Sequence, residues 1–156
     1  PGSPNAESGL LRFIANQVAA ALAAAGPALA ADSAALFKQR CAICHQDSAA
    51  GTPGLAPSLL GVHWQKLGAE RAYLPTVLLK GLSGPIKVDG QPFVGSMPAM
   101  APTLDDEALA AVANHLRGLQ GAAADKPYAA ADMAEARARP GNPTQSRNQR
   151  RQLLGE

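Results

Sequence analysis

Hydrophobic residues recur at helical spacing in a segment that follows Pro102. Apolar side chains that return every three to four residues lie on one face of a helix. We expect Asp105 to cap this helix, with Asp106 and Glu107 in its first turn, where the positive end of the helix dipole stabilises negative charge. The apolar positions on the predicted face are Leu109, Val112, Leu116 and Leu119. Gly121 follows them, so the pattern predicts a helix that ends close to this glycine.

Two further apolar patches predict helices earlier in the chain. The first begins at Asp32 or Ser33, because either side chain can cap a helix that runs into the segment around Cys41. The second covers residues 70–80 and contains Pro75. Proline lacks the amide proton that a helix interior needs, so we expect this residue near the first turn.

Between the predicted helices lie two long stretches rich in Gly and Pro, residues 46–66 and 82–102. Neither shows a convincing alternation of polar and apolar positions, so neither is predicted to contain a strand. Long loops in a compact domain are usually functional, and both stretches would be explained if they wrapped a cofactor. The pattern predicts one all-α domain over residues 32–120.

The two ends of the chain differ in pattern from this central domain. Residues 1–31 form an apolar segment with small residues at Ala28-Leu29-Ala30, which fits an export signal. The same segment also fits a retained helix that packs against a partner, because one face carries Leu10, Ile14, Val18 and Leu22. Its polar and Gly-Pro interruptions argue against a membrane-spanning helix. Residues 121–156 are rich in Ala and Arg and are predicted to be a C-terminal tail, either solvated or used as an interface.

Composition excludes one class of partner and indicates a cofactor. The 156 residues carry a net charge of +2, and only 4% of them are aromatic. This charge is small and the basic residues are not interleaved with aromatic ones, so no nucleic acid partner is expected. So few aromatic side chains provide little material for a core, and a buried cofactor would supply the missing apolar surface.

The candidate chemistry is concentrated in the segment Cys41-Ala42-Ile43-Cys44-His45. In a C-x-x-C-H sequence both thiols can add to the vinyl groups of one haem while the histidine binds iron. A thioredoxin-like pair would need a surrounding βαβ pattern, a zinc site would need another ligand pair, and a plain disulfide gives no role to His45. The motif predicts one haem c attached through Cys41 and Cys44, with His45 as an iron ligand.

A second iron ligand is expected among the methionines, because a thioether is the common partner of histidine in electron-transfer haems. Met97 and Met100 lie in one loop before the last predicted helix, whereas Met133 lies in the predicted tail. Met97 is the preferred candidate because Pro98 follows it and restricts the chain. Met100 is interpreted as a residue that fills a gap in the core.

The proximal histidine is expected to have a supporting carbonyl group. An axial histidine normally donates its second ring N–H to an acceptor, and residues 54–61 form a proline-containing loop shortly after His45. Pro57 is the candidate for that carbonyl, with an ordinary turn as the alternative. His63 and Trp64 are interpreted as packing residues or as contacts to a haem propionate.

These motifs together resemble the class I cytochromes c. The resemblance combines the C-x-x-C-H motif, the Gly-x-x-Pro-x-Leu-x-Gly form of residues 54–61, the Met97-Pro98 loop and the helix start at Leu104-Asp105-Asp106-Glu107, and it covers about residues 32–120. It implies an all-helical fold wrapped around one covalent haem, with terminal helices that cross near Phe37. His45 and Met97 would then be the axial ligands.

A narrower similarity concerns residues 80–98, which look like the haem domains that accompany periplasmic quinoprotein dehydrogenases or are fused to copper nitrite reductases. His115 departs from that group, which often has a tyrosine there. The resemblance implies a periplasmic one-electron carrier that accepts electrons from a dehydrogenase and passes them to an oxidase or another cytochrome. The alternative is a fixed haem subunit of a larger, membrane-associated redox complex, of unspecified oligomeric state. A haem enzyme would need an open sixth position, against which Met97 argues.

Overall fold

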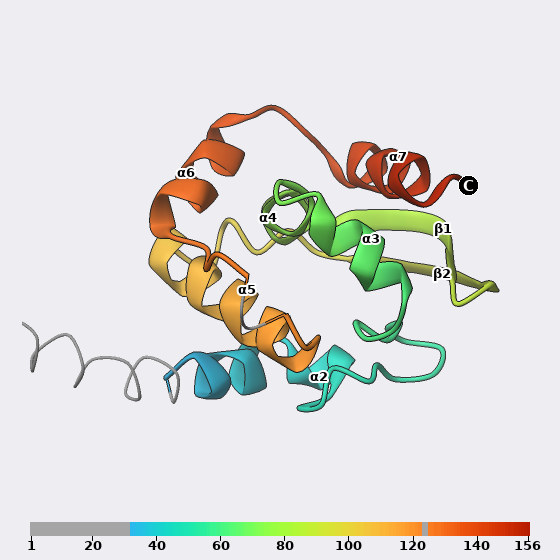
Figure 1. Cartoon of the computed structure of the whole chain (residues 1–156), viewed down its shortest axis with the longest axis horizontal. Coiled ribbons are helices and arrows are strands. Elements are labelled where there is room, and N and C mark those ends of the chain that lie inside the picture. Colours follow the sequence, from blue (N-terminus) through green and yellow to red (C-terminus); the bar gives the residue numbers. More distant parts are fainter. Residues whose placement is uncertain (1–31, 123–124) are drawn as a thin grey trace, which may run out of the picture.

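The computed structural model describes residues 32–122 and 125–156. Residues 32–40 are helical and lead directly into α2 (Ala42–His45). The elements that follow in Figure 1 are α3 (His63–Ala69), α4 (Tyr73–Lys80), β1 (Leu82–Val88), β2 (Gln91–Met97), α5 (Asp106–Leu119), α6 (Ala130–Ala138) and α7 (Pro143–Leu154). Both interpretations of residues 1–31, the export signal and the partner helix, lie outside the described residues.

Helix α5 confirms the helix that the apolar pattern predicts after Pro102. Its N-cap is Asp105, whose side chain accepts a hydrogen bond from the backbone N–H of Ala108 at 2.9 Å. This bond satisfies one of the amide groups that a helix leaves free at its start. Three of the four predicted apolar positions are buried, whereas Leu119 is 38% exposed.

Helix α4 lies at the centre of the fold and contacts α3, α5, α6 and α7. Pro75 occupies its first turn, as the sequence predicts, and Gly81 ends it with a φ of 75°. A helix with neighbours on so many sides exposes little surface to water, and six of its residues are buried whereas Thr76 and Lys80 are only partly buried. The buried residues are Tyr73, Leu74, Pro75, Val77, Leu78 and Leu79.

The prediction of a long loop over residues 82–102 is wrong, and the fold is mostly helical rather than all-α. Strands β1 and β2 pair antiparallel, with Leu82 opposite Met97 and Val88 opposite Gln91. The turn between them is Asp89-Gly90, and both residues have positive φ, 50° and 78°. This is the backbone of the two-residue turn that favours hairpins, since its twist matches that of the strands.

Helix α3 is a second difference from the predicted loops. It covers the end of the stretch 46–66 and extends to Ala69. Trp64 and Leu67 bury its inner face in the core, and this packing gives a short helix stability that its sequence alone does not provide. Within the described residues, none of the helices combines the length and the hydropathy needed to cross a membrane.

The segment predicted as a C-terminal tail carries two helices that pack on the domain. Helix α6 contacts α4 and α5, while α7 contacts β1, α3 and α4. Met133 of α6 is fully buried in the main core. Figure 1 shows α6 and α7 along the side of the molecule away from α2. Residues 125–156 therefore belong to the folded unit.

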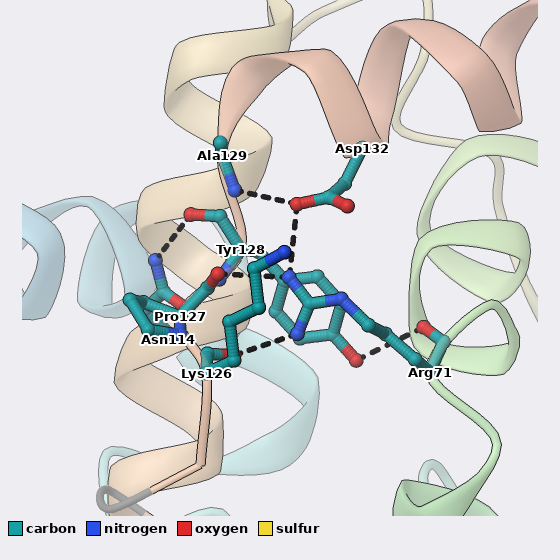
Figure 2. A network of polar contacts seen from close by, with 7 residues as sticks. All are labelled: Arg71, Asn114, Lys126, Pro127, Tyr128, Ala129 and Asp132. Carbon is teal, nitrogen blue, oxygen red and sulfur yellow. Dashed lines mark hydrogen bonds and ion pairs between the residues drawn. The ribbon is translucent and has the colours of Figure 1, made fainter.

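A network of polar contacts around Arg71 attaches the chain before α6 to the rest of the domain (Figure 2). The guanidinium of Arg71 donates to the carbonyl oxygens of Lys126 and Pro127 at 2.6 and 2.8 Å and to the carboxylate of Asp132 at 2.9 Å. It also lies 4.4 Å from the centre of the Tyr128 ring, within the range of a cation–π contact. One arginine thus holds the connection that leads to α6.

Candidate functional site

The residues that the sequence singles out lie around one cavity with about 1220 Å³ of unfilled space, part of it open to solvent. They come from three separate parts of the chain: α2, the loop before α3 and the end of β2. The residues are Cys41, Cys44, His45, Pro57 and Met97. The structure therefore brings the whole predicted set together.

His45 is 8% exposed, and its Nδ1 atom lies 3.2 Å from the carbonyl oxygen of Pro57. A carbonyl can only accept, so Nδ1 carries the proton in this bond and Nε2 keeps its lone pair. Burial lowers the pKa of His45, although the hydrogen bond to Pro57 acts in the opposite direction. The ring is therefore neutral and oriented, which are the properties of a metal-binding imidazole.

The loop between His45 and Pro57 turns back because a glycine allows it to. The N–H of Gly51 donates to the carbonyl of His45 at 3.0 Å, and the φ of Gly51 is 81°. A Cβ atom on Gly51 would lie 2.5 Å from the carbonyl carbon of Pro57, well inside van der Waals contact. Only glycine fits this position, and the close approach sets the place of the Pro57 carbonyl.

The two thiols lie in the turn of α2, where the N–H of Cys44 donates to the carbonyl of Cys41 at 3.1 Å. Both cysteines are free and partly buried. Burial, with a smaller contribution from neighbouring Cys44, raises the pKa of the Cys41 thiol to about 11. Cys41 is therefore a thiol rather than a thiolate at neutral pH.

Met97 and Met100 both line the cavity, whereas Met133 does not. Met97 ends β2, and a Cβ atom on Gly81 would lie 2.5 Å from its carbonyl oxygen. The N–H of Met100 donates to the carbonyl of Leu78 at 2.8 Å. The segment that carries the two thioethers is thus held against the end of α4.

The remaining wall of the cavity is mostly apolar. Alternate residues of the hairpin face it, because successive side chains of a strand point to opposite sides. The hairpin residues with this alternation are Leu82, Gly84, Ile86, Val88, Phe93, Gly95 and Met97. Side chains from the helices complete the wall, among them Phe37, Trp64, Leu74, Val77, Leu78 and Leu116.

Three further residues near the site, His63, Trp64 and His115, each contact another side chain. Buried His63 lines the cavity, and its Nδ1 lies 3.0 Å from a carboxylate oxygen of Asp89 in the hairpin turn. Trp64 packs against the Tyr73 ring, with 6.0 Å between centroids. The ring of His115 lies 5.1 Å from that of Phe37, where α5 meets the first helix.

The arrangement fits a haem attached through thioethers. The two thiols can add to the vinyl groups of a haem, the imidazole with its free Nε2 and a methionine thioether are suitable donors to iron, and the apolar walls match the porphyrin surface. Sequence reasoning missed Tyr73, Phe93 and Arg150, which also line the cavity. The Asp89-Gly90 turn could have indicated the hairpin and hence Phe93, whereas nothing in the sequence marks Arg150.

Comparison with known proteins agrees with this geometry. Residues 30–120 match the family model described as "Cytochrome c". The chain is 41% identical over 135 residues to a cytochrome c-552 of Thermus thermophilus, covering 82% of this chain and 90% of the relative. A second Thermus thermophilus cytochrome c-552 is 40% identical over 129 residues, covering 79% of this chain and 97% of the relative. The chain belongs to the cytochrome c family, whose members carry a covalently attached haem c and transfer electrons.

Proposed function

We propose that His45 and Met97 are the axial ligands of the haem iron, and that the protein carries single electrons between periplasmic redox partners. A dehydrogenase would be the donor, and an oxidase or another cytochrome the acceptor. The observation that supports the ligand assignment is that both residues line one cavity, with Cys41 and Cys44 on the same helical turn as His45.

The residues of the chain adjust this site for electron transfer. A bound haem supplies the one-electron exchange between ferric and ferrous iron. The Pro57 carbonyl holds the His45 ring in one orientation, and the neutral thioether of Met97 raises the reduction potential relative to harder ligands. The apolar walls exclude water, which disfavours the additional positive charge of the oxidised site.

Met97 is preferred to Met100 because its chain is fixed on both sides. Its backbone pairs with Leu82 in the hairpin, and Pro98, directly after it, has a fixed φ and restricts the backbone of Met97. In Met97→Ala we expect loss of the charge-transfer band between methionine sulfur and ferric iron, whereas Met100→Ala should keep it. The reverse pattern would assign the sixth ligand to Met100 and contradict the proposal.

Electron exchange is proposed at the cysteine edge of the cavity. Ile43, between the two cysteines, is 81% exposed, and Leu55 at the cavity rim is 55% exposed. The nearby charges of Lys38 and Asp47 are paired at 3.2 Å. Exposed Arg40 adds one positive charge at this edge, without an ion pair among the described residues, and a small, mostly apolar patch of this kind suits a short-lived contact between carriers.

The alternative, a fixed haem subunit, depends on segments that would bind another protein. In the described part of the chain, α6 and α7 pack on their own domain instead. Sedimentation of the purified protein at low micromolar concentration distinguishes the two functions. A carrier should be monomeric, whereas a stable complex that co-purifies with a dehydrogenase or oxidase would favour the subunit.

A further inference from the structure

One buried cation on the cavity has no acidic partner. Arg150 of α7 is 3% exposed and lines the same cavity as the cysteines. Its Nη2 atom donates to the carbonyl of Lys87 at 2.7 Å, whereas its Nε atom is buried and has no hydrogen-bond partner. The ion pairs found among the described residues do not include Arg150.

A buried charge without a counter-charge is costly. A buried guanidinium loses the hydration that stabilises its charge, and its contacts here, with the Lys87 carbonyl and the Tyr73 hydroxyl, supply no negative charge. Tyr73 lies beside the guanidinium, but burial raises the pKa of its hydroxyl despite the opposing charge of Arg150, so this hydroxyl stays neutral. The compensating anion must therefore come from what fills the cavity.

The haem carries two carboxylates that can supply this anion, and they lie on the edge of the porphyrin that faces away from the cysteines. Its propionate carboxylates leave the porphyrin at the edge away from the vinyl groups, to which the cysteines attach. Figure 1 shows α2, with the cysteine motif, and α7, with Arg150, on opposite sides of the molecule. A guanidinium can donate two parallel N–H groups to one carboxylate. The Arg150 Nε, which has no partner among the described residues, and a neighbouring terminal nitrogen could form such a pair of hydrogen bonds with a propionate.

We propose that Arg150 is a haem-binding residue that pairs with a propionate carboxylate and thereby makes the C-terminal helix α7 part of the haem site. This inference depends on the haem site described above. Other cations of the region do not match it. Arg40 lines the cavity but is exposed beside Cys41. Arg147 also has a buried Nε that lacks a partner in the described part of the chain, but its side chain is only partly buried and it is not among the residues that line the cavity.

The test is the reduction potential of the holoprotein in Arg150→Gln, Arg150→Lys and the control Arg151→Gln. Arg151 is exposed on the same helix, so its variant removes an equal charge without touching the cavity. Loss of a positive charge paired with a propionate favours the ferric state. In Arg150→Gln we expect the equilibrium constant for reduction to fall about tenfold, which for one electron is about 59 mV. Arg150→Lys should retain most of the potential, and Arg151→Gln nearly all of it.

Equal potentials in Arg150→Gln and Arg151→Gln would overturn the proposal. A second measurement uses the wild-type protein, in case the Arg150 variants do not fold. In the reduced, diamagnetic protein, nuclear Overhauser effects should connect the Arg150 guanidinium protons with the propionate methylene protons, and their absence would also overturn it. If the wild-type chain carried no covalent haem, the proposed function would fail instead, and a pyridine haemochrome spectrum separates the two cases.

Discussion

The guanidinium of Arg137 in α6 donates through Nε to the carboxylate of Asp106 in the first turn of α5, at 2.9 Å. Its two terminal nitrogens donate to the carbonyl oxygens of Ala101 and Leu104 at 2.9 and 3.0 Å. These carbonyls belong to the segment that follows Met97. A side chain from the C-terminal helices thus fixes the connection between the methionine segment and α5.

Arg137→Gln should lower the free energy of unfolding by about 1–3 kcal/mol, because three partly buried acceptors lose a charged donor. Denaturant titration of the holoprotein measures this change. The matched control is Arg139→Gln, since Arg139 makes only an exposed contact of 3.9 Å with Glu135. A control variant as destabilised as Arg137→Gln would contradict the role given to Arg137.

Gly51 and Gly54 form a second matched pair. Both have positive φ. A Cβ atom on Gly51 would collide with the backbone at Pro57, whereas a Cβ atom on Gly54 would have no neighbouring heavy atom of the described residues within 4 Å. Gly54→Ala should cost about 1–2 kcal/mol for its backbone conformation alone. Gly51→Ala should cost more and displace the Pro57 carbonyl from His45, which reduces the yield of haem-loaded protein. Equal yields and stabilities in the two variants would show that the close approach has no importance.

Asp132 predicts a pH dependence of stability. Its hydrogen bond from the N–H of Ala129 lowers the pKa from the usual 3.8, and Arg71 contributes in the same direction. A carboxylate with a lowered folded pKa stabilises the protein above its unfolded pKa, and this contribution is lost as the pH falls through the folded value. The free energy of unfolding should therefore decrease as the pH drops below about 4.

Asp132→Asn should show a shallower acid dependence than the wild-type chain. The control is Glu135→Gln, which removes one negative charge from an exposed position of the same helix. Equilibrium unfolding measured from about pH 2.5 to about pH 6 gives the slopes of stability against pH. An unchanged slope in Asp132→Asn would contradict the prediction.

Asn114 binds both backbone groups of Tyr128. Its Nδ2 donates to the Tyr128 carbonyl at 2.9 Å, and its Oδ1 accepts from the Tyr128 N–H at 2.7 Å. Asn114→Ala leaves both groups without partners and should destabilise the protein by about 2–3 kcal/mol. Hydrogen exchange at the Tyr128 amide should accelerate more than at amides of α2. Exchange that is unchanged at Tyr128 would show that water replaces the side chain at no cost.

The sequence predicts α5 well because its cap and its apolar stripe are local features. The hairpin was missed because Gly84 and Pro85 interrupt the alternation in β1, although Asp89-Gly90 is a strong turn signal. Helix α7 has no apolar stripe. Its buried residues are Ser146 and Arg150. Its packing therefore depends on polar groups, and the spacing of apolar residues along the sequence does not predict the partners of such groups.

The residues of the candidate site also differ in how far the sequence predicts them. The C-x-x-C-H motif is predictable because covalent attachment fixes its spacing. The choice between Met97 and Met100 depends on three-dimensional placement, and both residues line the cavity. Arg150 could not be predicted, because a basic residue in a polar segment is usually solvated.

The contact between Arg150 and the Lys87 carbonyl joins positions 63 residues apart in the chain. Closing so long a segment costs more configurational entropy than pairing neighbours, and contacts of this kind slow folding relative to a bundle with local contacts. The hairpin and α5 can form from nearby residues, whereas the wall made by α7 requires a late encounter between distant segments. We therefore expect the side of the cavity that α7 forms to close last during folding.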